Sequence, residues 1–131
     1  MKRINIIYWT SAAILALLSI AAAYGYLTQI KMQEMMGHLG FPPFFRVELA
    51  VAKLVGAVCL VAPVGARWKE WTYAGFAITY ISALIAHISM LDPFVMSLFP
   101  ILALALLSVS YYCYRKRETY RLRQIPDRST R

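Results

Sequence analysis

The sequence predicts an all-α protein: four transmembrane helices in an antiparallel, up-down bundle, with a short interfacial helix in the first loop. Two observations predict this fold class. Apolar residues make up 60% of the 131 residues and charged residues only 15%, whereas an ordinary soluble domain is apolar over about half its length. In addition, four mainly apolar stretches approach the ~20 residues that cross a bilayer core, at about residues 6–27, 45–62, 71–90 and 94–114.

The first stretch follows Lys2 and Arg3 and ends near a run of alanines at 21–23. A cleaved signal peptide has a similar pattern. The apolar run is, however, longer than the ~7–15 residues of a signal peptide's hydrophobic region, so a retained helix is favoured.

The first loop predicts a short helix on the outer surface. Its apolar positions recur at i, i+3, i+4 and i+7, which is one helical face: Met32, Met35, Met36 and Leu39. Gly40 and the Pro42–Pro43 pair then end the pattern before the second span. We expect the methionines to cap the bundle, and we expect His38 to be a solvated loop residue rather than a metal ligand.

The distribution of Lys and Arg predicts the orientation, because these residues favour the cytoplasmic side. Eleven of the 14 lie at the N-terminus, in the loop between spans two and three, and in the C-terminal tail; only Lys31 and Arg46 lie on the other side, and Lys53 lies inside a span. Both termini are therefore predicted to be cytoplasmic. The chain divides into a membrane domain, 1–114, and a basic cytoplasmic tail, 115–131, that meets anionic lipid headgroups.

Several function classes find no support. The chain has no glycine-rich phosphate loop, no HExxH and no CxxC, and its two cysteines lie in apolar stretches. The net charge of +8 is explained by the positive-inside pattern, so nucleic acid is not expected as a partner. No metal site and no catalytic residue can be named, and whether the chain is an enzyme stays open.

Polar side chains inside spans two and three mark the candidate ligand-binding pocket. Ionisable groups in a span usually face the bundle interior or water and are a functional hint. Span three also carries a stripe at i, i+7 and i+14. With a close approach at Ala52 and Gly56, these features predict a polar pocket between the two spans, lined by Glu48, Lys53, Tyr73, Tyr80 and His87. The alternative is structural: Glu48 and Lys53 neutralise one another, and His87 makes a single hydrogen bond.

The middle of the chain resembles the DoxX-like family. The residues that carry the resemblance are Leu39-Gly40-Phe41-Pro42-Pro43-Phe44-Phe45, Ala52-Lys53-Leu54-Val55-Gly56-Ala57 and Lys69-Glu70-Trp71-Thr72-Tyr73-Ala74-Gly75-Phe76, followed by His87 and Asp92. The resemblance implies a small four-helix protein of the bacterial inner membrane. Because relatives associate with redox enzymes, it also implies an accessory subunit of a quinone-linked or sulfur-handling complex, with a quinone or other isoprenoid lipid as ligand.

Two other functions stay open at the level of sequence. One is a non-enzymatic membrane scaffold or assembly factor, whose basic tail recruits lipids or a protein partner. The other is a small proton-linked carrier, which would act as a dimer because four spans are few for a transport pathway.

Overall fold

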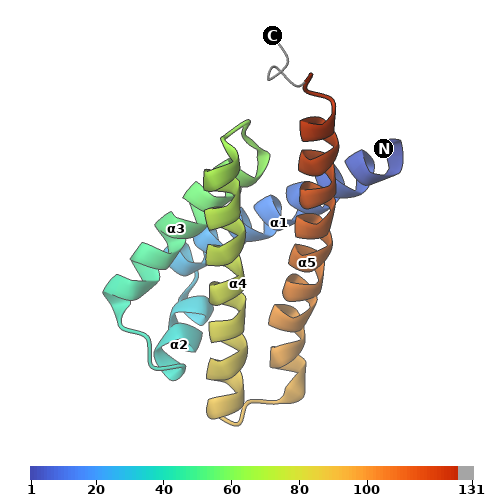
Figure 1. Ribbon diagram of the computed structural model, residues 1–131. Coiled ribbons are helices and arrows are strands. Elements are labelled where there is room, and N and C mark those ends of the chain that lie inside the picture. Colours follow the sequence, from blue (N-terminus) through green and yellow to red (C-terminus); the bar gives the residue numbers. More distant parts are fainter. Residues whose placement is uncertain (127–131) are drawn as a thin grey trace.

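The computed structural model describes residues 1–126, and this part of the chain is helical without a strand. The helices follow one another closely along the chain (Figure 1): α1 Lys2–Thr28, α2 Ile30–His38, α3 Pro43–Val61, α4 Ala66–Ser89 and α5 Phe94–Arg123. The short helix predicted in the first loop is present as α2.

Three helices, α1, α4 and α5, are long and apolar enough to cross a membrane. The 19-residue α3 carries Arg46, Glu48 and Lys53 and is not one of them. Isoleucines on the outer face of α4 are exposed, at 78, 81, 85 and 88. Such a face is suited to lipid rather than to water, because a soluble monomer rarely exposes a large contiguous apolar patch.

Prolines set the ends of α3. Pro43 is its first residue, a position where the missing N–H is no loss and the fixed φ already suits a helix. At the other end Ala62 turns to extended geometry, with φ −76° and ψ 152°, because the following Pro63 disfavours the helical conformation of the residue before it. The predicted boundaries of this stretch are therefore close to the observed ones.

The regular up-down bundle is not confirmed. Helices α4 and α5 run side by side in opposite directions, but α1 crosses behind them at a wide angle (Figure 1). Helix α3 packs mainly on α1 and touches α4 over a smaller area than predicted, but the close approach predicted at Gly56 is present, against Phe76 of α4. Helix α5 also continues to Arg123, so the predicted basic tail begins as helix. Asp127, Arg128 and Arg131 of that tail lie outside the described residues.

The core lies where α1, α4 and α5 meet. Its largest members are aromatic and come from all three helices: Tyr8, Tyr73, Phe76, Tyr80 and Tyr114. The N-terminus, the α3–α4 loop and the end of α5 lie toward one end of the molecule, and α2 and the α4–α5 loop toward the other (Figure 1). We call these the basic end and the histidine end.

Helices α2 and α4 both finish in a Schellman motif, in which a left-handed residue follows the helix and two backbone N–H groups bond back to its last turn. After α2 the left-handed residue is Gly40, with φ +86°. After α4 it is Leu91, with φ +56°, and Asp92 N–H donates to the His87 carbonyl at 3.1 Å. The motif therefore brings His87 and Asp92 together.

Leu91→Gly is expected to raise the free energy of unfolding by about 0.5–1 kcal/mol. The left-handed conformation costs a residue with a side chain roughly 1–2 kcal/mol, and glycine avoids this cost. Part of the gain in stability is lost because glycine also gives the unfolded chain more conformational freedom. The Leu91 side chain is 91% exposed, so little packing is lost. Thermal unfolding in neutral micelles measures the change.

Gly40→Ala is the matched control for this prediction. An added Cβ at Gly40 meets nothing within 4 Å, so the substitution adds only the energetic cost of holding alanine in a left-handed backbone conformation. This variant is expected to be less stable than the parent. If both variants shifted stability in the same direction, the left-handed strain would not be the cause.

Candidate functional site

Lys53 is the most unusual of the predicted site residues. Its side chain is only 6% exposed on α3, and its Nζ lies 5.1 Å from the centre of the Tyr80 ring on α4. Such a cation–π contact contributes about 0.5–2 kcal/mol. Within residues 1–126, Lys53 has no carboxylate partner. A buried ammonium without a counter-charge is costly, so Lys53 is a candidate ligand-binding residue.

A hollow of about 250 Å³ lies beside Lys53, between α3 and α4. Apolar and aromatic side chains form most of its wall, with two threonines and a cysteine: Leu49, Ala52, Val55, Cys59, Trp68, Trp71, Thr72, Gly75, Phe76 and Thr79. Gly56 sets how closely the helices approach, because a Cβ there would lie 2.8 Å from the Phe76 ring. The hollow offers an apolar slot with a single cation.

The other four predicted residues do not line this hollow. Glu48 is exposed on α3 and makes no ion pair with Lys53. Tyr73, Tyr80 and His87 are all buried on α4, as expected for a stripe on one helical face. Of these, only Tyr80 meets Lys53.

Tyr73 belongs to the interface of α4 with α5. Its hydroxyl and that of Ser110 lie 2.8 Å apart, and its ring stacks on Tyr114 with the ring centres 5.6 Å apart. A buried tyrosine hydroxyl usually finds such a partner. Tyr73 is therefore explained by packing between these two helices.

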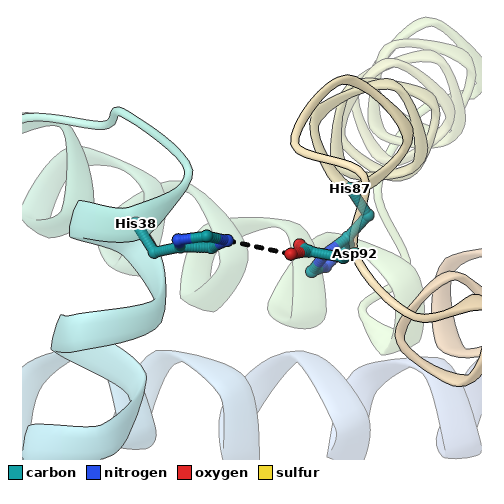
Figure 2. A network of polar contacts seen from close by, with 3 residues as sticks. All are labelled: His38, His87 and Asp92. Carbon is teal, nitrogen blue, oxygen red and sulfur yellow. Dashed lines mark hydrogen bonds and ion pairs between the residues drawn. The ribbon is translucent and has the colours of Figure 1, made fainter.

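The histidine end holds a cluster that sequence analysis did not anticipate. His87 Nδ1 donates to Asp92 Oδ2, and His38 Nε2 donates to Asp92 Oδ1, each at 2.8 Å; the carboxylate is an acceptor only. In Figure 2 the His38 ring points from α2 toward this carboxylate. The cluster links α2 to the end of α4. His38, expected to be a solvated loop residue, is exposed and also hydrogen-bonds to Asp92. The pairing of His87 with Asp92 depends on the Schellman geometry after α4.

The two hydrogen bonds from His87 and His38 lower the pKa of Asp92 below its ordinary value of 3.8. A lowered folded-state pKa means that the carboxylate's contribution to stability is complete above pH 4 and is lost as the pH falls through the folded value. We expect the stability difference between the parent and Asp92→Asn to shrink below pH 4. Unfolding of both proteins from pH 3 to pH 6 checks this, and a difference that stayed constant to pH 3 would contradict it.

The sequence profile of the DoxX-like family matches residues 10–110. The chain belongs to the DoxX-like family. The match covers most of the chain and includes both Lys53 with its hollow and the Asp92 cluster. No curated protein and no solved structure matches the chain. Together with the three long apolar helices, membership of this family identifies a membrane protein.

The basic end of this DoxX-like protein is also organised by polar contacts. The Lys69 ammonium donates to the Leu60 carbonyl at the end of α3. Glu70 accepts hydrogen bonds from Tyr111 at 2.9 Å and from Arg115 at 3.0 Å. These contacts tie the start of α4 to α3 and α5. Within residues 1–126, no group of three His, Cys, Asp or Glu side chains is arranged to hold a metal ion.

Proposed function

We propose that this DoxX-like protein is an accessory membrane subunit that binds the headgroup of a quinone or similar isoprenoid lipid in the hollow between α3 and α4. The observation that carries the proposal is the Lys53 ammonium, 6% exposed and without a carboxylate partner in the described chain. A ligand carbonyl oxygen would accept its N–H and supply the missing hydrogen bond. A hydrogen bond to a charged group contributes about 1.5–3 kcal/mol.

The size and lining of the hollow favour a flat ring. A volume of about 250 Å³ corresponds to roughly eight water molecules at about 30 Å³ each, which suits one ring but not a whole lipid. Trp68, Trp71 and Phe76 supply aromatic walls, and aromatic rings prefer offset-stacked or edge-to-face neighbours. The isoprenoid tail would then lie along the exposed apolar side of the helices.

The membrane placement that goes with this proposal is the bacterial inner membrane, with both termini cytoplasmic and α3 as a fourth span. The Lys and Arg excess at the basic end supports this orientation. Burial of Lys53 inside the protein supports a spanning α3, because an intramembrane cation is tolerated when it faces other helices. The association with a redox enzyme rests on the resemblance to the family alone.

Lipid extraction of the purified full-length protein, followed by mass spectrometry, tests the binding proposal. We expect an isoprenoid quinone to co-purify with the parent, and Lys53→Met to retain at least about tenfold less, the loss expected for one charge-assisted hydrogen bond. Methionine is unbranched and apolar, so the helix and its burial are kept. Lys31→Met, which removes an exposed lysine from α2, is the matched control and should retain the ligand.

The outcomes also separate the other two functions. A parent protein that carries no quinone-class molecule would overturn the proposal and favour a membrane scaffold or assembly factor, which needs no pocket. Proton flux through reconstituted dimers, without a bound quinone, would favour the proton-linked carrier.

A further inference from the structure

A second hollow, larger than the Lys53 hollow and separate from it, lies at the basic end. It measures about 650 Å³ and is bounded by the start of α1, the α3–α4 loop and the last turns of α5. Neither the family motifs nor the proposed quinone site accounts for it. Three of the residues that line it have a structural role given above: Tyr8 and Tyr114 belong to the core, and Lys69 donates to the Leu60 carbonyl.

Cations dominate the ionisable groups around this hollow. Lys69, Arg117 and Arg121 line it, against the single carboxylate of Glu118. Within residues 1–126, none of the three cations makes an ion pair. By contrast, Arg115, two residues before Arg117, is paired with Glu70 and does not line the hollow.

Arg117 is held in place by aromatic rings. Its guanidinium carbon lies 4.3 Å from the centre of the Tyr8 ring and 5.5 Å from that of Trp9, and both rings line the same hollow. Contact with ring faces restrains the guanidinium group, and the planar fork of its N–H donors matches two phosphate oxygens. The hollow thus contains a preorganised anion-binding group.

The remaining wall indicates what carries the anion. Val61, Pro63, Val64 and Trp9 add an apolar surface to the hollow, and tryptophan and tyrosine side chains are typical of the level of lipid headgroups. A free nucleotide or an acidic protein would not need an apolar wall at the end of membrane helices. A lipid offers a phosphate group and an acyl chain together.

We propose that the basic-end hollow is a specific site for an anionic phospholipid, whose phosphate is bound by Arg117 and Arg121. Such a site differs from the diffuse attraction of a basic tail for an acidic membrane. Binding then depends on where a cation lies relative to the hollow as well as on its charge. The inference stands independently of the quinone proposal.

Native mass spectrometry of the full-length protein in neutral detergent tests the site. The protein is titrated with phosphatidylglycerol, with phosphatidylcholine and with soluble glycerol phosphate. We expect one phosphatidylglycerol to bind preferentially, and Arg117→Gln to weaken its binding about tenfold, since the lost contact is bidentate and charge-assisted. Lys116→Gln, which removes the same charge from an exposed neighbour outside the hollow, should weaken it about twofold or less.

Arg121→Gln guards against a folding defect in Arg117→Gln, because Arg121 is exposed and its loss does not disturb the Tyr8 contact. We expect this variant also to bind phosphatidylglycerol more weakly than Lys116→Gln does, with unchanged helical content. Equal losses in all three variants would show diffuse attraction and overturn the proposal. Equal binding of the two phospholipids, or tighter binding of glycerol phosphate than of phosphatidylglycerol, would also overturn it.

Discussion

Gly56→Ala is expected to be less stable than Gly75→Ala by about 1–3 kcal/mol in free energy of unfolding, the usual cost of overpacking a tight contact. A Cβ at Gly56 would lie 2.8 Å from Cε2 and Cζ of Phe76, whereas a Cβ at Gly75 meets nothing within 4 Å. Both glycines lie inside helices, so the gain of about 1 kcal/mol in helix propensity cancels in the comparison. The Phe76 ring is buried and stacked on Tyr80, so it has little room to yield.

Unfolding of both variants in mixed micelles, followed by far-ultraviolet circular dichroism, gives the difference. Phe76→Leu in the Gly56→Ala background should recover part of the loss, because the smaller side chain vacates the space that the new methyl group needs. Equal stability of the two alanine variants would show that α3 and α4 are not held together at Gly56.

Lys69→Met is expected to lower the free energy of unfolding by about 1.5–3 kcal/mol, the contribution of a hydrogen bond to a charged group. Lys69 is buried at the start of α4 and donates to the Leu60 carbonyl. That carbonyl is in the last turn of α3, where backbone oxygens have no partner within the helix. A cation at this position also complements the negative end of the helix dipole.

Lys2→Met is the control for Lys69→Met, since Lys2 is exposed at the start of α1. Its effect on the same unfolding measurement should be within about 0.5 kcal/mol, as for most exposed positions. If the two variants were equally stable, the bond from Lys69 to α3 would contribute nothing and the α3–α4 loop would be held by packing alone.

The helices themselves could be predicted because apolar length and proline positions are local properties of the sequence. Pro43 begins α3, Pro63 follows its end, and the methionine face of the first loop is part of α2. The burial of Tyr73, Tyr80 and His87 followed from helical periodicity alone. Membership of the DoxX-like family likewise rested on short motifs that are visible in the sequence.

The partners of the buried polar groups could not be predicted in this way. The sequence predicted that Glu48 and His87 lie with Lys53, but helix pairing decides such contacts, and α3 packs mainly on α1 and only over a smaller area on α4. The Asp92 cluster depends on the left-handed turn at Leu91, a position where glycine would be the usual signal. Without that glycine, no local pattern indicated that His38 and His87 share one carboxylate.

Tryptophan fluorescence tests directly the proposed binding of a quinone-class ring by Lys53 between α3 and α4. In a Trp9→Phe background the remaining tryptophans, Trp68 and Trp71, both line that hollow. Titration with a short-chain quinone, an electron acceptor that quenches a nearby indole, should give saturable quenching that Lys53→Met weakens about tenfold or more. Quenching that rises linearly and identically in both proteins would mean simple partitioning into the micelle and would contradict the account.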